Sequence, residues 1–448
     1  MSERSTIARH AGTVLVGQLA VMAYGVTDTL VAARHSSEAL AALSVGSAVY
    51  ISIFVALNGM LQALLPVWAE HHGAGRQAGV GHSFRQSLYL YAALVVIGIA
   101  ALLCPGPLLR WTQVPPALQP DVTRYLAVLA LALPAALGFR LYSTLNQALG
   151  KPLLVTWLQV GSLFVKAPLS IWLTFGGGGL PSLGVAGCAW ATLCVSAAMM
   201  IMALWLLGTE PMYHPYRLWK RLEPPHWPTL RAFARLGIPT ALSIMVEVTS
   251  FTLMALFIAR MGTVAAASHQ IASNVTAMLY MVPLSLSIAT SARVSYWLGA
   301  QDPVRARQAL RAGLHWVLAL ALALAVGVAA AHHWIAALYA ADRREVVTLA
   351  GSLLLWVAVY HLADASQAFC VFILRCYRIA TAPLVVYCVL LWGIGLVGGY
   401  MLAYPGGQTH PQSSPADFWA MGALALVLTA VTLAGLLVHA VRRHGLQR

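Results

Sequence analysis

Long apolar segments alternate with short polar ones along the whole chain. A helix needs about 20 predominantly apolar residues to cross a hydrocarbon core, and twelve segments come close to or exceed that length. Glycine, proline and charged residues separate them, as is typical of loops between helices. The predicted spans are 11–33, 39–66, 84–104, 122–145, 153–176, 183–207, 232–259, 266–297, 312–340, 346–372, 381–403 and 418–441. The pattern predicts an all-α polytopic membrane protein.

The composition agrees with this architecture. Hydrophobic residues make up 60% of the 448 positions and charged residues 9%, whereas a soluble globular chain carries about 25% charged residues. The six cysteines lie in or beside apolar segments without metal-ligand spacing, so no metal is expected there. The net charge of +14 comes from bases scattered over short loops, which argues against a nucleic acid as a partner.

The distribution of lysine and arginine over the loops predicts the orientation of the chain. With the N-terminus inside, nineteen bases fall on the inside, six on the outside, and two, Arg140 and Lys166, within predicted spans. Because inside loops accumulate positive charge, both termini are expected on the cytoplasmic side.

The longest charged interruption, residues 208–231, lies near the midpoint and separates six predicted spans from six. "TLVAARHSSEALAALSVGSAV" in the first half is echoed by "TLMALFIARMGTVAAASHQIASNV" in the second. Two halves that each have an even number of spans are parallel repeats. We predict an N-terminal lobe over 1–207, a cytoplasmic linker over 208–231 and a C-terminal lobe over 232–448.

Three acidic residues, Asp28, Glu247 and Asp364, lie well inside predicted spans. A carboxylate there costs at least about 2.5 kcal/mol, and therefore usually faces a cavity or a partner. Tyr360 precedes Asp364 by one helical turn, which places both on one helix face. Carboxylate and phenol oxygens suit Na⁺, and a buried carboxylate can equally carry a proton. The alternative for Glu247 is a polar contact between helices, and Asp28 could instead reach interfacial water.

Further polar residues interrupt the apolar spans. Taken together with one methionine, they predict the lining of an interior cavity. Each polar residue alone more often forms an interhelical hydrogen bond, and a methionine is more often a packing residue. The set is Asn58, Gln62, Gln270, Asn274 and Met278.

Several segments, "GQLAVMAYGVTDTLVAA", "GIPTALSIMVEVTSFTLMALFIARMG" and "ASHQIASN" among them, resemble the multidrug and toxic compound extrusion (MATE) family, particularly its NorM-like branch. The similarity covers nearly the whole chain. It implies two six-helix lobes that export small cationic amphiphilic drugs in exchange for inward Na⁺ or H⁺. We accordingly expect a monomer in the lipid bilayer of a bacterial inner membrane.

The resemblance also implies roles for individual residues. Glu247 matches the family's essential glutamate in the C-terminal lobe. Asp364 and Tyr360 match the residues that complete a cation site with it. Asp28 matches an aspartate of the N-terminal lobe that is protonated in proton-coupled relatives.

One position departs from the family pattern. NorM-like proteins usually carry an asparagine in the fifth helix, whereas this chain has Lys166 in "VKAPLSIW". We hypothesise that Lys166 pairs with Asp28 and holds it ionised, so that coupling runs through Glu247 and Asp364. In the alternative, Lys166 snorkels to an interface and leaves Asp28 free to titrate.

Other function classes fit the sequence less well. A flippase or exporter of a lipid-linked or other endogenous metabolite on the same fold is expected to have a more basic cavity. A membrane enzyme is disfavoured because no paired catalytic residues lie near a membrane face and no glycine-rich loop is placed to cradle phosphate. A channel is disfavoured by the repeat of two halves. The expected function is a secondary antiporter with no cofactor besides its coupling ion.

Overall fold

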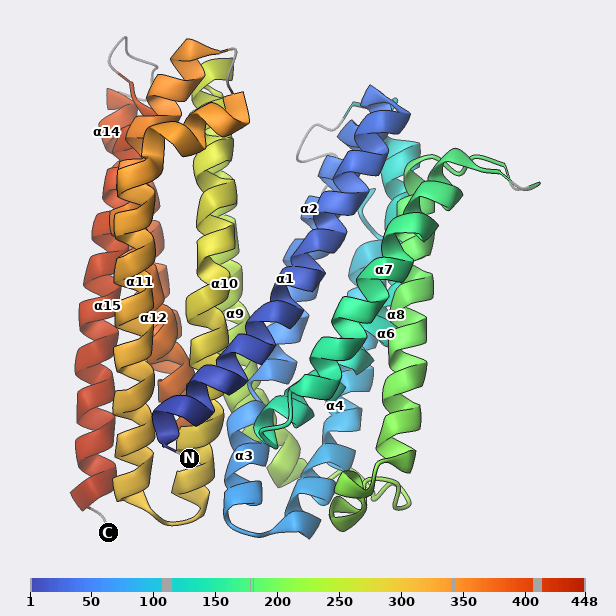
Figure 1. Cartoon of the computed structure of the whole chain (residues 1–448), viewed down its shortest axis with the longest axis vertical. Helices are drawn as coiled ribbons and strands as arrows, with labels where there is room; N and C mark the ends of the chain where they lie inside the picture. The colour runs from blue at the N-terminus through green and yellow to red at the C-terminus, as the bar shows by residue number, and fades with distance from the viewer. Residues whose placement is uncertain are drawn as a thin grey trace. The chain divides into compact units, whose positions relative to one another are not determined.

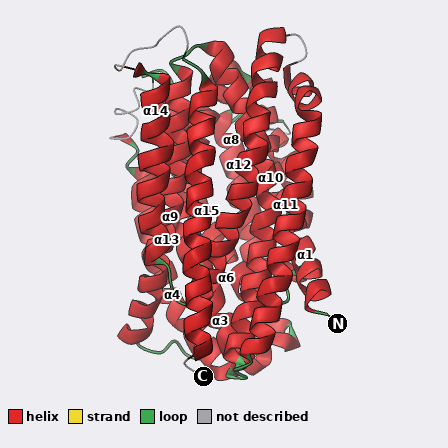
Figure 2. Cartoon of the chain, turned by 90° about the vertical axis from the view of Figure 1, so that its left-hand side faces the viewer, coloured by secondary structure: helices red, strands yellow, loops and turns green. Residues whose placement is uncertain are grey.

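A computed structural model describes residues 2–106, 115–177, 179, 181–340, 343–405 and 413–446 of the chain. Helices form nearly all of this described part, and loops and turns join them (Figure 2). The predicted all-α class is confirmed.

The helices follow one another along the chain without a domain of another class. η1 is a 3-10 helix and η2 is a π-helix. In chain order they are α1 (Glu3–His35), α2 (Ser37–Gln62), α3 (Leu65–Gly73), α4 (Gln77–Leu103), α6 (Gln119–Ala148), α7 (Leu153–Phe175), α8 (Val185–Thr209), η1 (Pro211–Tyr216), α9 (Trp227–Ala259), α10 (Thr263–Gly299), α11 (Pro303–Ala340), α12 (Arg344–Cys376), α13 (Thr381–Tyr387), η2 (Cys388–Val397), α14 (Gly398–Ala403) and α15 (Pro415–Leu446).

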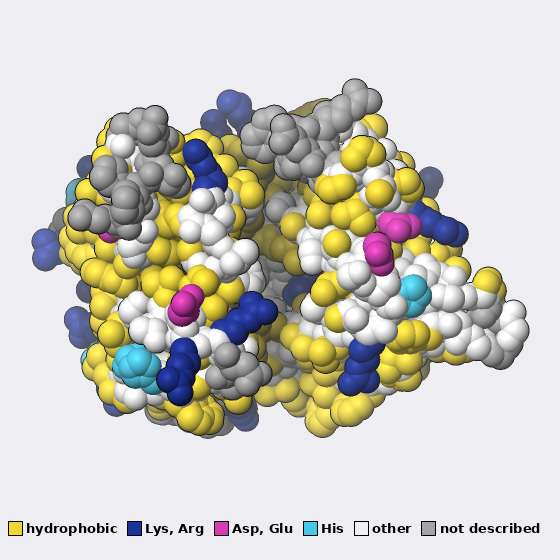
Figure 3. Space-filling view, turned by 90° about the horizontal axis from the view of Figure 1, so that it is seen from above, with side chains coloured by type: hydrophobic (Ala, Val, Ile, Leu, Met, Phe, Trp, Pro, Cys, Tyr) yellow, Lys and Arg dark blue, Asp and Glu magenta, His cyan; other side chains and the backbone are white. Residues whose placement is uncertain are grey.

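Twelve helical segments among the described residues are long and apolar enough to cross a membrane, as predicted. The second span, Ser37–Gly73, combines α2 and α3, and the eleventh, Thr381–Ala403, combines α13, η2 and α14. Hydrophobic side chains cover much of each part of the chain, with scattered charged groups between them (Figure 3). The chain is a multi-pass membrane protein.

Several helices begin earlier than the predicted spans. α1 begins at Glu3 rather than at residue 11, and α4 begins at Gln77 rather than at residue 84. Hydropathy marks only the part of a helix that lies in hydrocarbon, whereas the backbone hydrogen bonds continue into the polar headgroup region.

By packing, the chain forms two compact units. The first-half unit is Thr13–Ala241, and the second-half unit combines Met1–Gly12 with Leu242–Arg448. The long helices of each unit run side by side (Figure 1). The units differ from the predicted lobes, because their boundaries fall inside α1 and α9, and because the 208–231 segment belongs to the first-half unit.

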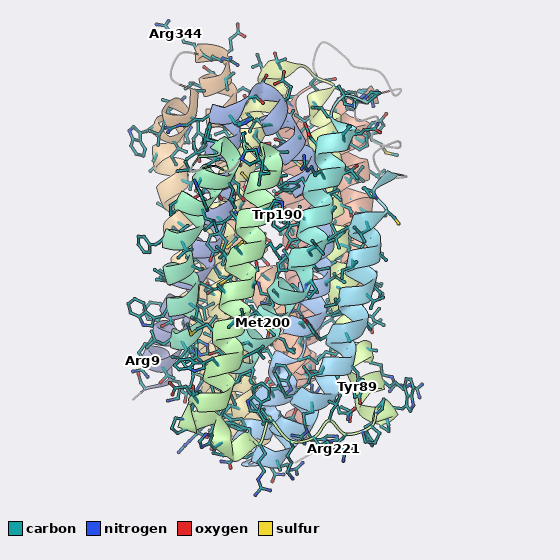
Figure 4. All side chains as sticks on the ribbon, turned by 90° about the vertical axis from the view of Figure 1, so that its right-hand side faces the viewer. Arg9, Tyr89, Trp190, Met200, Arg221 and Arg344 are labelled. Carbon is teal, nitrogen blue, oxygen red and sulfur yellow. The ribbon has the colours of Figure 1, made fainter. Side chains whose placement is uncertain are left out.

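In the first-half unit, α6 packs against α2, α4 and α8. Glycines allow some of these close crossings, since small residues let helix backbones approach in a membrane. Gly138 of α6 faces Met200 of α8, and a Cβ added there would lie 2.7 Å from the Met200 Cε. Met200 lies near the middle of α8, below Trp190 (Figure 4).

The predicted linker folds onto the first-half unit through buried polar contacts. Tyr213 is buried and donates a hydrogen bond to Asn146 Oδ1 at 2.8 Å. Arg85 of α4 donates to Glu223 Oε1 at 2.5 Å, and this hydrogen bond lowers the pKa of the Glu223 carboxyl. Tyr89 also donates to the Glu223 carbonyl, at 2.8 Å, and lies at the same end of the unit as Arg221 (Figure 4).

In the second-half unit, α12 packs against α10, α11 and α15. The first turn of α1 belongs here because Glu3 accepts hydrogen bonds from Arg293 Nη2 at 2.6 Å and from Trp297 Nε1 at 3.1 Å, both on α10. Ile7 and Ala11 continue this contact, since both are buried in the apolar core of the unit.

We expect Gly187→Ala to destabilise the first-half unit. A Cβ at Gly187 of α8 would lie 2.6 Å from the Leu173 carbonyl carbon of α7, so the two backbones must separate. Overpacking of this kind costs about 1–3 kcal/mol. Thermal unfolding of the purified protein in detergent should show a lower midpoint for Gly187→Ala. Gly161→Ala on α7 is the control, because its added Cβ meets nothing within 4 Å. Equal midpoints for the two variants would contradict the close crossing.

Candidate functional site

Glu247 and Tyr360 line a cavity inside the second-half unit. The cavity holds ≈ 30 Å³ of space for water-sized molecules, and a void needs about 10–15 Å³ to hold a water. The cavity therefore has room for a water molecule or a small cation beside the Glu247 carboxylate. Its other lining residues are Ser250, Phe251, Met254, Leu391, Gly395, Leu396, Phe418, Gly422 and Leu426.

Helical periodicity explains how α9 presents this surface. Glu247, Ser250, Phe251 and Met254 follow the spacing i, i+3, i+4, i+7, which places them on one face of a helix. Another wall includes Leu391, Gly395 and Leu396 of the π-helix η2. Trp392 of η2 also donates a hydrogen bond from Nε1 to the carbonyl of Val246, at 3.1 Å, so the two walls are joined next to Glu247.

Aromatic packing holds Tyr360 beside the cavity. Its ring centroid lies 5.4 Å from that of Trp419 and 6.4 Å from that of Phe251, both in edge-on geometry. Phe251 and Trp419 contact each other edge-on as well, at 5.9 Å. Edge-to-face contacts are favourable for aromatic pairs. The three rings restrict how far the Tyr360 phenol can move.

Asp364 lies one turn further along α12, as predicted from its spacing to Tyr360. It is buried and accepts a hydrogen bond from Gln367 Nε2 at 2.9 Å. The amide oxygen of Gln367 in turn accepts a hydrogen bond from the Tyr387 hydroxyl. Asp364 is not among the cavity-lining residues, but it is close enough to Glu247 to repel it electrostatically. Two acids placed in this way favour the uptake of positive charge.

Sequence reasoning missed three residues around the acids. Gln367 follows Asp364 by three positions on the same predicted span, and this spacing could have identified it. Tyr387 comes from another helix, so no local pattern indicates its contact. Arg375 was expected in an inside loop, but it is buried in the last turn of α12, with its guanidinium 4.6 Å from the Phe372 ring centroid.

Asp28 and Lys166 form a buried ion pair in the first-half unit. Lys166 Nζ lies 2.7 Å from Asp28 Oδ1 and 2.8 Å from Oδ2. The ammonium also donates to Thr192 Oγ1 at 2.8 Å and to the Cys188 carbonyl at 3.1 Å, while Ser170 Oγ donates to Asp28 Oδ1 at 3.0 Å. The predicted pairing is confirmed. The snorkelling alternative is wrong, because Lys166 is 0% exposed and its ammonium is bound inside the protein.

Five residues, Asn58, Gln62, Gln270, Asn274 and Met278, were predicted to line a substrate cavity. None of these five lines the cavity beside Glu247. Gln270 donates a hydrogen bond to Asn274 Oδ1 at 3.1 Å, and Met278 is exposed one turn further along α10. Asn58 and Gln62 lie half-buried one turn apart on α2. A substrate-binding role for these five residues stays a prediction.

We expect Lys166→Met to destabilise the protein far more than the removal of both charges. Breaking a buried ion pair by removing one partner costs about 3–5 kcal/mol, because the other charge stays buried without compensation. The double variant Asp28→Asn/Lys166→Met leaves no uncompensated charge and should recover most of that loss. Thermal unfolding in detergent of the wild type, both single variants and the double variant measures the coupling. Additive losses would show that the two residues do not interact.

Comparison with known proteins shows which family the chain belongs to. A model of the MatE family matches residues 14–172 and 239–401. The probable multidrug resistance protein NorM of Aromatoleum aromaticum is 37% identical over 97% of this chain and 94% of its own length. The multidrug resistance protein PmpM of Pseudomonas aeruginosa is 31% identical over 99% of this chain and 92% of its own length. The crystal structure of the Vibrio cholerae MATE transporter VcmN in the bent form shares the fold, with a TM-score of 0.83 and 17% identity over 99% of this chain and 98% of that chain. The chain belongs to the MatE family, as its sequence motifs suggested.

Proposed function

We propose that this chain is a secondary active multidrug efflux antiporter, which exports small cationic amphiphilic compounds in exchange for inward Na⁺ or H⁺. The proposal is supported by relatives that are named multidrug resistance proteins and that match nearly the whole chain. The observation that carries the coupling role is the cavity beside Glu247 and Tyr360, with Asp364 close by.

The second-half acids are suited to a cation that binds and leaves. Glu247 faces a void that a small cation or a water molecule can enter, and no ion pair with a basic residue within 4.0 Å blocks it among the described residues. Carboxylate and phenol oxygens are hard ligands for Na⁺, and the same carboxylates accept a proton. Glu247, Asp364 and Tyr360 therefore form the proposed cation-coupling set for either ion.

The Asp28–Lys166 pair has a different proposed role. Both carboxylate oxygens of Asp28 accept hydrogen bonds from the ammonium, so protonation of Asp28 would break a buried ion pair. Leaving one member of a buried ion pair without its partner is strongly destabilising, so the pair is suited to holding the helices together. We assign coupling to the second-half unit and a structural role to the pair.

Linkage explains how the two fluxes are coupled. If the cation and the drug bind preferentially to different conformations, binding of one promotes release of the other. Entry of Na⁺ or H⁺ from outside neutralises the Glu247 and Asp364 site and favours the conformation that releases drug outward. Loss of the cation to the inside restores the carboxylates and favours return. The transporter acts in this scheme as an inner-membrane monomer with both termini in the cytoplasm.

Glu247→Gln should abolish efflux of a fluorescent organic cation from proteoliposomes. The amide keeps the size of the side chain but cannot hold the charge that attracts a cation. Export by the wild type should depend on an imposed Na⁺ gradient or on an imposed proton gradient, and this dependence identifies the coupling ion. In Glu247→Gln the rate should fall to that of vesicles without protein.

Asp121→Asn provides the matched control, because Asp121 is an exposed acid in the first turn of α6. This variant should export the dye at the wild-type rate with the same ion dependence. Equal thermal midpoints for the two variants separate loss of coupling from loss of folding. Wild-type export by a folded Glu247→Gln protein would refute the coupling role.

A further inference from the structure

Arg375 is a buried charge in the second-half unit that the proposed cycle does not use. It is 4% exposed and lies in the last turn of α12, the helix that also carries Tyr360 and Asp364. Buried charges in proteins are normally paired with an opposite charge and hydrogen-bonded, because their transfer out of water is costly. The surroundings of Arg375 show whether it has such a partner.

Arg375 has no such partner in the described part of the chain. The ion pairs within 4.0 Å among those residues involve other side chains. The guanidinium atoms Nε and Nη1 are enclosed by the protein and have no hydrogen-bond partner. A buried donor without a partner loses the hydrogen bonds that water gives it, so each such group in a folded protein needs an explanation. A partner that Arg375 binds in only one part of a transport cycle supplies one.

The guanidinium of Arg375 extends toward the coupling acids. Long side chains of a helix lean toward its N-terminus, and Arg375 does so, since its Cζ lies 4.6 Å from the ring centroid of Phe372, one turn earlier. Asp364 lies on the same face of α12, about three turns before Arg375. The guanidinium interacts electrostatically with the Glu247 carboxylate of α9. Arg375 is therefore near the acids without forming an ion pair with them.

Two tyrosines share these surroundings. Tyr280 of α10 and Tyr387 of α13 each interact electrostatically with Arg375 and with Glu247. Tyr387 also donates a hydrogen bond to the amide oxygen of Gln367, whose Nε2 donates to the Asp364 carboxylate. A phenol can accept a hydrogen bond from a guanidinium and donate one to a carboxylate. Polar side chains of α10, α12 and α13 thus surround both the base and the acids.

The charges around Glu247 do not cancel. Asp364 and Arg375 are the charged residues that act on it in the described part of the chain, so the site combines two acids with one base. One bound Na⁺ or proton brings the sum to zero. Because like charges repel, Arg375 weakens the attraction of the acids for that cation. For the same reason it favours the ionised carboxylates after the cation has left.

We propose that Arg375 is a positioning residue of the antiport cycle, an internal counter-cation that competes with the coupling cation at Glu247. It weakens binding of the coupling cation and stabilises the empty carboxylates, so that the cation leaves to the inside and the empty transporter returns. This inference rests on the proposed antiport function. A purely structural Arg375 would affect folding and the maximal rate, but not the cation concentration at which the rate is half-maximal.

Removal of the positive charge tests this role. Arg375→Met keeps much of the side-chain length without an enclosed donor, and apolar replacements of buried charges are often tolerated. Export of a fluorescent organic cation from proteoliposomes is measured against external Na⁺ at fixed pH and against external pH without Na⁺. The half-maximal Na⁺ concentration should fall at least about threefold, or the half-maximal pH should rise by at least about half a unit, because the acids then attract a cation more strongly. The maximal rate should fall, because the cation leaves more slowly.

Further variants show whether the charge itself is responsible. Arg375→Gln also removes the charge, with a polar amide in place of an apolar chain, and gives the same measurement if Arg375→Met does not fold. Arg375→Lys keeps the charge and should stay within about twofold of the wild-type half-maximal value. Arg344→Met is the matched control, because it removes an exposed base from the other end of α12 and should change neither value.

Cation binding to the purified protein in detergent, measured for the same variants, separates this inference from the proposed function. An unchanged half-maximal value in folded Arg375→Met or Arg375→Gln, or an equal shift in Arg375→Lys, overturns the counter-cation role, even where wild-type export follows an imposed gradient as antiport requires. Tighter cation binding by the two variants without the charge, with no gradient-driven export by the wild type, supports the counter-cation role and refutes antiport.

Discussion

The cost of holding charge inside a hydrocarbon layer determines how this protein is built. The bilayer core offers no water to polar groups, so a helix carries an ionised residue there only if the protein compensates for it. Asp28 is compensated by the Lys166 ammonium at 2.7 Å. Glu247 is instead placed beside a small cavity. The two buried acids are therefore accommodated differently, Asp28 by an ion pair and Glu247 by a void beside its carboxylate.

These two solutions distinguish the two units. The first-half ion pair is saturated, because the Lys166 ammonium also bonds to Thr192 and to the Cys188 carbonyl. The second-half acids repel each other and have Tyr360 and Gln367 as neutral neighbours. A saturated pair resists a change of charge, whereas two neighbouring acids gain from one. The asymmetry favours coupling through the second-half unit, although the sequence repeat relates the two halves.

Apolar run length and the cost of buried charge were sufficient to predict much of this structure. They gave the number of spans, and they identified Asp28, Glu247 and Asp364 without structural information. They did not predict that Tyr387 bonds to Gln367, since that contact joins residues on separate helices. They also placed Arg375 in a loop, because a base near the end of an apolar segment has the same pattern whether it is buried or exposed. The first turn of α1 joins the second-half unit through Glu3 and Arg293, a contact between distant residues that no local pattern contains.

One wall of the cavity beside Glu247 is formed by a span that is not a regular α-helix throughout. The π-helix η2 replaces α-helical geometry over Cys388–Val397, and π-helical turns are rare and often occur at functional sites. A π-helix is wider than an α-helix, so Leu391 and Gly395 reach the cavity from a backbone that a regular span would place differently. Trp392 fixes this backbone to the Val246 carbonyl, immediately before Glu247. One hydrogen bond thus joins the irregular wall of the cavity to α9 at the residue next to Glu247.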